Sequence, residues 1–250
     1  MNTYVMSDIH GQYEAYLDIL EQISFENFSK RDKLYILGDV IDRGLDSIKI
    51  LQHIKSNQDK ISLLMGNHEL MMVESYPFPK MKLLYSEKAK LWTRNGGETT
   101  YAEFSELSRN EQGEILDFLR NLPYHKIIQV NNQKYYLVHA MPYHGKTSSS
   151  SNGILSMSKR KQMLWGMFES YENKNVTVLF GHRCVALYDP KFRDNLEIPE
   201  HFEIYQEDNY IAVDCGCAYR NKLSRLGCIR LQDGAKFYGK LKNFSDSVYW

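Results

Sequence analysis

Three short runs in the first third of the chain combine metal-binding or proton-transferring side chains with a nearby glycine. They are residues 8–10 (DIH), 38–44 (GDVIDRG) and 66–69 (GNHE), and each follows a compact apolar stretch. Strands that end in tight turns would hold such side chains above a sheet edge. One run alone means little, because Asp-x-His occurs by chance and most Asp-Arg pairs are solvated ion pairs. The three runs in order predict a two-metal site that hydrolyses phosphoesters.

Six side chains are the candidate metal ligands. Asp8 and His10 offer one oxygen and one nitrogen to a first ion, and Asp39 can bridge this ion to a second. Three residues at the ends of their own apolar runs would complete the ligands of the second ion: Asn67, His139 and His182. Imidazole, carboxylate and amide ligands without thiolate suit manganese, iron or zinc. Two such ions, about 3.5–4 Å apart, would share a hydroxide that attacks phosphorus.

Residues that are not ligands have expected roles in catalysis. His68 follows Asn67 directly, so it should lie at the rim of the site, where it can protonate the departing alkoxide as a general acid. A carboxylate at Asp42 can orient and charge this histidine, and Arg43 offers a planar fork for phosphate oxygens. Glu69 is expected to support the ligands or to cap a helix.

Length and charge limit the class of protein. We expect the 250 residues to form a single domain. The 31 basic and 31 acidic residues cancel, which argues against a nucleic-acid partner. The start of the chain does not resemble a signal peptide and no segment is long enough to span a bilayer, so a cytoplasmic protein without a membrane partner is expected. The four cysteines lack paired spacing and are expected to be reduced and mostly buried.

The elements that must position the site alternate between strand and helix patterns. Apolar runs at 4–6, 34–37 and 61–65 each end at one of the polar runs, and helical spacing follows each of them. Open α/β sheets place their sites at such strand ends. Residues 92–97 look like a helix that ends in a glycine turn.

Hairpins are expected in the second half of the chain. One turns over residues 131–133 and another over Asp233 and Gly234, which together with the early parallel units favours a mixed sheet arrangement of the α/β class. Ser108 and Glu111 fit a capping box. A helical cap is expected at about residues 70–122.

The motifs, together with residues 137–140 (LVHA) and 180–182 (FGH), resemble the signature of the phosphoprotein phosphatase family of metallophosphoesterases, above all its bacteriophage-lambda-like bacterial branch. Residues 95–97 (NGG) and 213–216 (VDCG) are also similar to stretches in that branch. The resemblance implies a calcineurin-like fold of two mixed sheets packed face to face with helices outside. It further implies hydrolysis of phosphomonoesters, usually phosphoserine or phosphothreonine of proteins, and manganese as the expected metal.

The same resemblance implies roles for nine residues of this sequence. Residues that match Asp8, His10, Asp39, Asn67, His139 and His182 bind metals in the family, and those that match Asp42, Arg43 and His68 assist catalysis.

The chain departs from the family pattern at the second phosphate-binding arginine. In the phage-like branch this arginine follows an apolar-Trp pair, but here Leu164 and Trp165 are followed by Gly166 and Met167. Arg183 or Arg160 could take its place in space.

Two other functions stay open. A related branch hydrolyses diadenosine tetraphosphate, but its members resemble an Ala-Arg-Gly version of the second run, whereas this chain has Asp42. A non-catalytic metal-binding scaffold is the alternative of a different class, against which Asp42, Arg43 and His68 argue together. The expected partner is a phosphorylated protein or peptide, or a small phosphoester, bound by a monomer.

Overall fold

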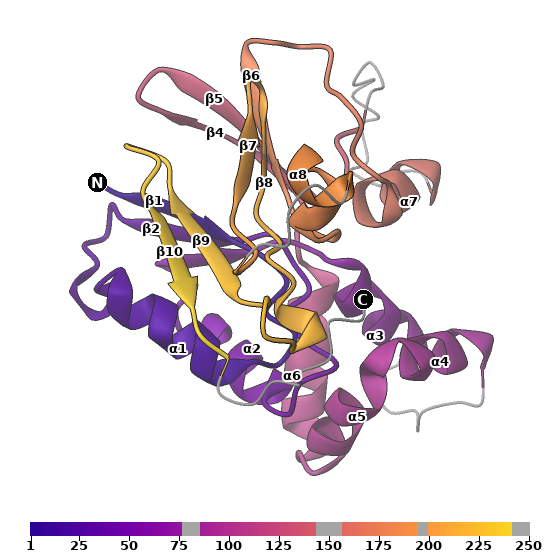
Figure 1. Cartoon of the computed structure of the whole chain (residues 1–250). Coiled ribbons are helices and arrows are strands. Elements are labelled where there is room, and N and C mark those ends of the chain that lie inside the picture. The colour runs from indigo at the N-terminus through magenta and orange to yellow at the C-terminus, as the bar shows by residue number, and fades with distance from the viewer. Residues whose placement is uncertain (77–85, 144–156, 195–199, 242–250) are drawn as a thin grey trace, which may run out of the picture.

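Two five-stranded mixed sheets form the centre of the fold (Figure 1). The computed structural model describes residues 1–76, 86–143, 157–194 and 200–241. The first sheet has the order β10-β9-β1-β2-β3, in which β1, β2 and β3 are parallel and β9 and β10 join in antiparallel pairing. Its strands are β1 (Thr3–Met6), β2 (Lys33–Ile36), β3 (Ile61–Leu63), β9 (Leu226–Arg230) and β10 (Lys236–Gly239).

The second sheet has the order β4-β5-β6-β8-β7. Its three central strands are parallel, and β4 and β7 pair with them in antiparallel fashion. The strands are β4 (His125–Val130), β5 (Gln133–Val138), β6 (Val176–Phe180), β7 (Tyr205–Glu207) and β8 (Tyr210–Ala212). Both predicted hairpins are present, β4–β5 and β9–β10, and the predicted arrangement of two mixed sheets with helices outside is confirmed.

Strands of the first sheet bury both faces, because the residues that alternate along them belong to two different cores. Tyr4 and Met6 of β1 pack in a cluster with the helices, whereas Val5 packs with residues of the second sheet. In β2 the same division separates Leu34 and Ile36 from Tyr35. The two sheets therefore share one apolar layer and the helices cover the opposite face.

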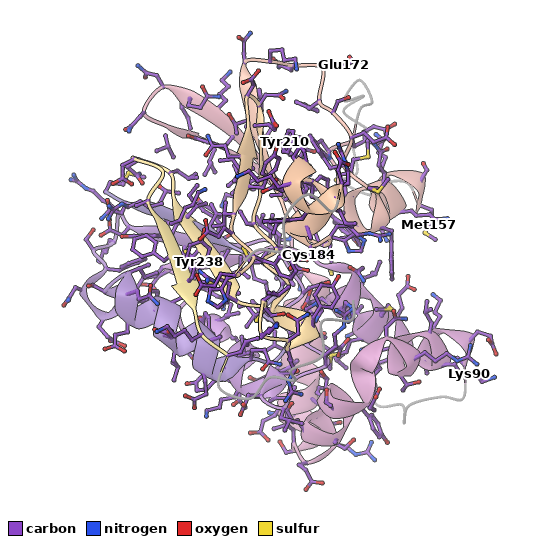
Figure 2. All side chains as sticks on the ribbon, viewed as in Figure 1. Lys90, Met157, Glu172, Cys184, Tyr210 and Tyr238 are labelled. Carbon is purple, nitrogen blue, oxygen red and sulfur yellow. The ribbon has the colours of Figure 1, made fainter. Side chains whose placement is uncertain are left out.

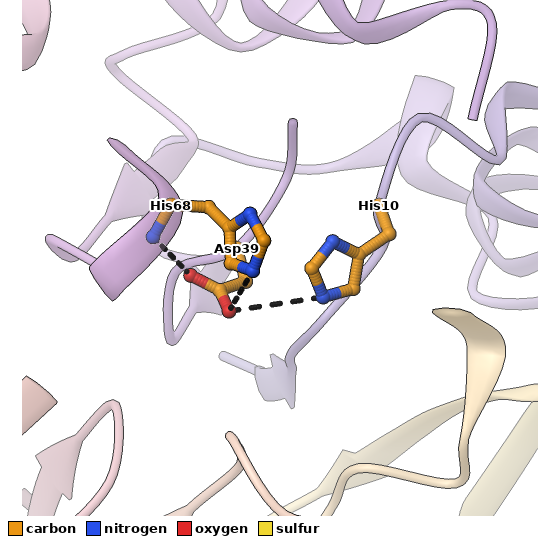
Figure 3. A group of neighbouring side chains, drawn as sticks. All are labelled: His10, Asp39 and His68. Carbon is orange, nitrogen blue, oxygen red and sulfur yellow. Dashed lines mark hydrogen bonds and ion pairs between the residues drawn. The ribbon is translucent and has the colours of Figure 1, made fainter. Parts of the chain in front are cut away.

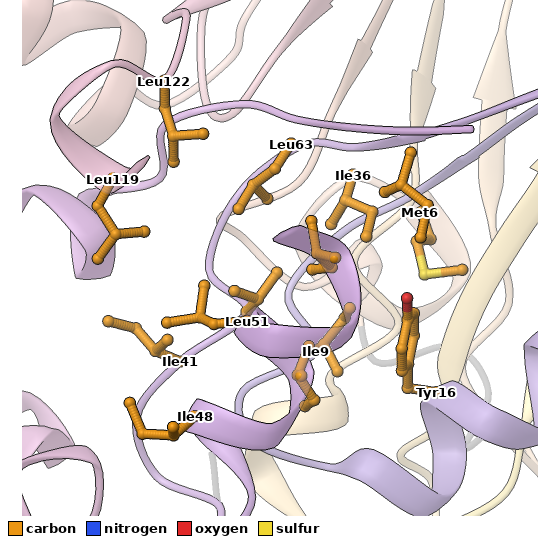
Figure 4. Packing of buried hydrophobic residues seen from close by; sticks show 14 of the residues in the cluster. Met6, Ile9, Tyr16, Ile36, Ile41, Ile48, Leu51, Leu63, Leu119 and Leu122 are labelled. Atoms are coloured by element: carbon orange, nitrogen blue, oxygen red, sulfur yellow. The ribbon is translucent and has the colours of Figure 1, made fainter. Parts of the chain in front are cut away.

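Helices α1 (Tyr13–Gln22), α2 (Ser47–Ser56) and α6 (Arg109–Arg120) cover the outer face of the first sheet (Figures 1 and 4). Their apolar stripes meet the sheet in the cluster drawn in Figure 4, where Tyr16 lies near Met6 and Leu51 near Ile9. The predicted capping box starts α6, since the backbone N–H of Glu111 donates to Ser108 Oγ and the N–H of Ser108 donates to Glu111 Oε2. No helix in the described ranges is long and apolar enough to cross a bilayer.

The remaining elements lie beside the strand ends. They are α3 (Asn67–Ser75), α4 (Glu87–Trp92), a π-helical turn η2 (Thr93–Gly97), α5 (Glu98–Ser105), α7 (Met157–Trp165) and α8 (Pro190–Arg193), with short 3₁₀ turns at Phe25–Asn27, Val185–Leu187 and Cys217–Tyr219. The predicted break at the glycines is present. Gly96 has a φ of +97°, which is not helical, and this kink separates the helix that runs through Trp92 from α5.

The loops after β2 and β3 touch through their glycines. Gly38 has a φ of +102°, and a Cβ added to it would lie 2.5 Å from the Cα of Gly66. A Cβ on Gly66 would in turn lie 2.2 Å from Asp39 Oδ1. Only glycine lets these two backbones approach so closely, and this contact sets the spacing of the site residues that follow them.

Replacement of Gly38 by alanine should lower the free energy of unfolding by about 1 to 3 kcal/mol, because the added methyl group meets backbone at a positive φ. Gly113→Ala is the matched control: Gly113 lies inside α6 with nothing within 4 Å of an added Cβ, so the same change should stabilise the helix by about 0.5 to 1 kcal/mol. Urea denaturation of both variants measures this difference, and equal effects would contradict the proposed role of the glycine contact.

Candidate metal and phosphate site

The site is built from turns at the ends of five strands. Six of its residues that are not glycine have a positive φ, between +47° and +73°, and these are Asp8, His10, Asp39, Asp42, Arg43 and His182. Each such conformation costs about 1 to 3 kcal/mol and persists only where the surrounding structure holds the residue in place. Their concentration at one place is typical of functional sites, where side chains must leave the direction of the strand.

Backbone hydrogen bonds hold the first two turns together. The N–H groups of Asp8, His10 and Gly11 donate to the carbonyl oxygens of Gly38, Asp39 and Val40, at 3.1, 3.0 and 2.9 Å. The ladder between β1 and β2 thus continues beyond the strands into both polar runs. Side chains of the two runs are therefore fixed relative to each other.

Asp39 lies at the centre of the imidazoles (Figure 3). Its Oδ2 lies 3.7 Å from His10 Nε2, 3.9 Å from His68 Nε2 and 3.3 Å from His139 Nε2. Its Oδ1 accepts the backbone N–H of His68 at 3.0 Å, which fixes the carboxylate plane. One oxygen of one buried carboxylate thus faces nitrogens from three separate loops.

Two groups of candidate ligand atoms meet at this carboxylate. The first contains His10, Asp39 and His68, and the second contains Asp39, His139 and His182, each with ligand atoms within 4.8 Å of one another. Asn67 belongs to the second group, because its Oδ1 lies 2.8 Å from His139 Nε2 and 3.0 Å from His182 Nδ1. The arrangement suits two ions that share Asp39.

Asp8 is not a member of either group, but it lies next to His10. Its Oδ1 is 3.9 Å from His10 Nε2, and its Oδ2 accepts the backbone N–H of His182 at 2.9 Å. Asp8 thereby joins the first sheet to the second across the site. His68 takes a place in the first group, but its Nε2 lies 3.3 Å from Arg43 Nη2, a cation that opposes a metal ion at this nitrogen.

Two histidines have a ring nitrogen aimed at a backbone carbonyl. His10 Nδ1 lies 2.9 Å from the oxygen of Ile41, and His139 Nδ1 lies 2.9 Å from the oxygen of Leu37. A carbonyl can only accept, so Nδ1 of each ring carries a proton, and Nε2 is the nitrogen that faces the site. This is the usual arrangement behind a metal-binding histidine.

The charges of the site suit the binding of divalent cations. Burial and the neighbouring Asp214 raise the pKa of Asp8 well above its ordinary value, and burial raises the pKa of Asp214 to about 6. Burial also lowers the pKa of His10 well below its ordinary value and that of His182 to about 3, so both rings are neutral at pH 7. Neutral imidazoles can bind divalent ions directly. The positive charge of such ions would also favour the ionised form of the two buried acids.

Asp39 and His139 differ from these groups, because each of the two side chains stabilises the charged form of the other. Burial opposes ionisation of Asp39, but His139, His68 and His10 outweigh it and keep its pKa well below the ordinary value. Burial likewise opposes a charged His139, yet Asp39 and Asp8 raise its pKa above the ordinary value. A metal ion at His139 Nε2 would replace the proton that this ring otherwise holds.

Asp42, His68 and Arg43 form a connected group next to the candidate ligands. His68 Nδ1 lies 2.6 Å from Asp42 Oδ2, and both side chains are buried. This bond directs His68 Nε2 toward Arg43 and the cavity. When His68 is protonated, its Nε2 and the guanidinium are two donors that face the same space, a geometry suited to a phosphoryl group and its leaving oxygen.

Glu69 holds the turn that carries Asp39. Its carboxylate accepts three backbone N–H groups, from Asp39 at 2.8 Å, Val40 at 2.9 Å and Gly66 at 3.0 Å. Burial, and then the nearby Asp39, raise the pKa of Glu69 to about 7. The side chain thus both caps α3 and ties its first turn to the loop after β2.

A cavity of about 320 Å³ opens over these groups. Most of the candidate residues line it: Asp8, His10, Asp39, Arg43, Asn67, His68, His182 and Arg183. Asp42 and His139 stand behind this lining, joined to it by the bonds to His68 and Asn67.

Arg183 and Arg160, the two candidates for the second phosphate-binding arginine, lie at different places in the structure. Arg183 lines the site cavity, whereas Arg160 lines a different cavity and stacks over the ring of Tyr124 at 5.6 Å. At Gly166 a Cβ would lie 2.5 Å from the carbonyl oxygen of Gln162, so this position cannot hold an arginine without a shift of backbone. Of the two candidates, only Arg183 lines the site cavity.

Six residues at the site were not predicted to act there. Five of them line the cavity, namely Asn95, Trp165, Asp214, Ala218 and Tyr219, and the sixth, Trp92, lies behind it against Asp42. Asp214 could have been found, because it ends the apolar run 211–213 in the manner of the other site residues. The aromatic residues carry no such signal in the sequence.

The cysteines take no part in the candidate ligand groups of the described chain. All four are free and buried as expected, and burial raises the pKa of each thiol. Figure 2 shows Cys184 in the interior, whereas Lys90 and Glu172 lie at the periphery. Thiols of this kind are inert packing groups.

The calcineurin-like phosphoesterase family matches residues 1–213. The chain belongs to this family. The match confirms the predicted fold and the resemblance to metallophosphoesterases. Membership of this family implies divalent metal ions, for which the two groups that meet at Asp39 are the candidate ligands.

Relatives with different activities are similar to this chain. Serine/threonine-protein phosphatase 2 of Escherichia coli (strain K12) is 34% identical over 140 residues, which cover 55% of this chain and 57% of that protein. The symmetrical bis(5'-nucleosyl)-tetraphosphatase of Buchnera aphidicola subsp. Acyrthosiphon pisum (strain 5A) is 41% identical over 73 residues, which cover 29% of this chain and 26% of that protein. The matches thus span from about a quarter to little more than half of these relatives.

Solved structures share the fold over nearly the whole chain. A protein serine/threonine phosphatase from Saccharomyces cerevisiae with similarity to human phosphatase PP5 has a TM-score of 0.63 and 16% identity, and the match covers 98% of this chain and 82% of that one. A metallophosphoesterase from Sphaerobacter thermophilus has a TM-score of 0.52 and 13% identity, with 98% and 88% covered.

Proposed function

We propose that this metallophosphoesterase is a phosphatase that removes phosphate from phosphoserine and phosphothreonine of proteins. The observation that carries the proposal is the buried Asp42–His68 pair, which places a histidine and Arg43 beside two groups of metal-ligand atoms. This constellation supplies a proton donor and a phosphate fork where the leaving oxygen of a monoester would lie.

The ligands in this proposal divide around Asp39. Asp8, His10 and Asp39 would hold one ion, and Asn67, His139 and His182 would hold the second together with Asp39. Two divalent ions, for which we propose manganese, would activate water for attack on phosphorus and neutralise phosphoryl charge when bound.

The other site residues bind and protonate the substrate. Arg43 would grip two phosphoryl oxygens with its planar guanidinium, and Arg183 would add a second positive charge at the same cavity. His68 would donate its Nε2 proton to the leaving oxygen. Asp42 would hold this imidazole in place through its bond to Nδ1.

Hydrolysis of diadenosine tetraphosphate is the alternative activity. The symmetrical tetraphosphatase named above supports it. Asp42 argues for the phosphatase instead, because its carboxylate is fully buried and bonded to His68. A proton donor of this kind serves a serine or threonine alkoxide, which is a poor leaving group, far more than it serves a phosphate leaving group.

A substrate panel tests the proposed activity. The manganese-loaded protein should turn over para-nitrophenyl phosphate, and its kcat/KM for phosphoserine and phosphothreonine peptides should exceed that for a phosphotyrosine peptide and for diadenosine tetraphosphate. A preference for the dinucleotide would establish the alternative. No turnover of any ester by fully metallated protein would contradict both activities and favour a non-catalytic scaffold.

His68→Ala tests the proton donor. The variant should keep its metal content but lose about 10²- to 10⁴-fold in kcat for alkyl phosphates. Aryl esters such as para-nitrophenyl phosphate should be slowed much less, because their leaving group departs without a proton. His201→Ala, at a histidine outside the cavity, is the control and should change neither rate. Equal slowing of alkyl and aryl esters would show that His68 is not the leaving-group acid.

A further inference from the structure

The Asp42 carboxylate lies between an imidazole and an indole. Trp92 Nε1 donates to Asp42 Oδ2 at 2.9 Å and to Oδ1 at 3.1 Å, and the indole is fully buried. The same Oδ2 lies 2.6 Å from His68 Nδ1. Trp92 comes from α4, 50 residues after Asp42, so a helix far along the chain sets the position of this carboxylate.

The turn after Trp92 holds the neighbouring Arg43. The N–H of Arg43 donates to the carbonyl oxygen of Gly96 at 3.0 Å, and a Cβ on Gly96 would lie 2.7 Å from Arg43 Cγ. Gly97 leaves room for the indole, because a Cβ there would lie 2.5 Å from Trp92 Nε1. Residues 92–97 therefore form a cradle that fits both Asp42 and Arg43.

The backbone at Asp42 and Arg43 needs such a support. Both residues have a positive φ, +73° and +69°, which is unfavourable for side chains of this size. The N–H of Asp42 donates to Thr100 Oγ1 at 2.9 Å and to Ser47 Oγ at 3.0 Å, and Thr100 belongs to α5, which follows the cradle directly. The turn 42–43 is thus held by the segment 92–100 as well as by its own sheet.

We propose that Trp92 is a positioning residue of the phosphatase. Its indole N–H fixes the plane of the Asp42 carboxylate, and Asp42 in turn fixes the ring of His68 for proton donation to the leaving oxygen. The inference rests on the proposed function of His68. A buried tryptophan needs an acceptor, and a backbone carbonyl would satisfy a purely structural role. Here the acceptor is the carboxylate that orients the proton donor.

The aromatic neighbours of Trp92 support the indole without touching Asp42. Tyr76 packs against it edge to face, with ring centroids 6.0 Å apart, and Phe104 packs on Tyr76 at 5.1 Å. Loss of packing in this group and loss of the indole N–H can therefore be separated by mutation. Phe104→Leu weakens the packing and leaves the hydrogen bond to Asp42 in place.

The test compares alkyl and aryl phosphates in Trp92→Phe. Removal of a hydrogen bond to a charged group should lower kcat for an alkyl phosphate by about tenfold more than kcat for para-nitrophenyl phosphate. KM and metal content should stay the same. Phe104→Leu should lower the melting temperature without changing the ratio of the two rates. A benzothienylalanine residue at position 92, which has sulfur in place of the N–H and keeps the shape of the ring, should give the same ratio as phenylalanine.

A double-mutant cycle assigns the effect to Asp42. In an Asp42→Ala background, Trp92→Phe should leave the alkyl-to-aryl ratio unchanged, because the carboxylate through which it acts is gone. Equal slowing of both esters by Trp92→Phe, or a further change of the ratio in that background, overturns the proposal for Trp92. If His68→Ala shows the alkyl preference and Trp92→Phe does not, only Trp92 is assigned wrongly. If neither shows it, the proton-donor role of His68 fails and the role of Trp92 fails with it.

Discussion

The buried carboxylate of Asp39 is the group on which the rest of the site depends. Its Oδ2 faces the Nε2 atoms of His10, His68 and His139, which come from different loops, and its Oδ1 is held by a backbone N–H. Such a charge is stable inside a protein only if cations or donors surround it. Each strand end that contributes to the site therefore has to deliver one such group to the same point.

The residues that surround Asp39 come from both sheets, so they join the two sheets. Several of them also have a strained backbone. His139 and His182 come from the second sheet, yet His139 Nδ1 bonds to Leu37 and the N–H of His182 bonds to Asp8, both at strand ends of the first sheet. The positive φ values at the site fit the same picture, because a turn that leaves a strand abruptly brings its side chain over the sheet edge. Glu69 and the cradle at 92–97 are the supports that hold these turns.

The strand ends could be predicted from the sequence because the signal is local: an apolar run, a polar ligand and a glycine stand next to each other. That pattern located Asp8, Asp39, Asn67 and His182. His139 follows an apolar run without a neighbouring glycine, and the structure brings all five residues together. Contacts between distant segments carry no local signal. The indole of Trp92 meets Asp42 only because α4, η2 and α5 fold back over the turn at 42–43, and the close approach of Gly96 to Arg43 is likewise visible only in the fold.

Manganese titration followed by equilibrium dialysis tests whether two ions share Asp39. The unmodified protein should bind two ions per chain. Asp39→Asn should bind at most one, because the amide loses the charge that faces both ligand groups. Asp117→Asn changes an exposed carboxylate on α6 in the same way and should still bind two. Two ions retained by Asp39→Asn, or fewer than two bound by the unmodified chain, would contradict the account.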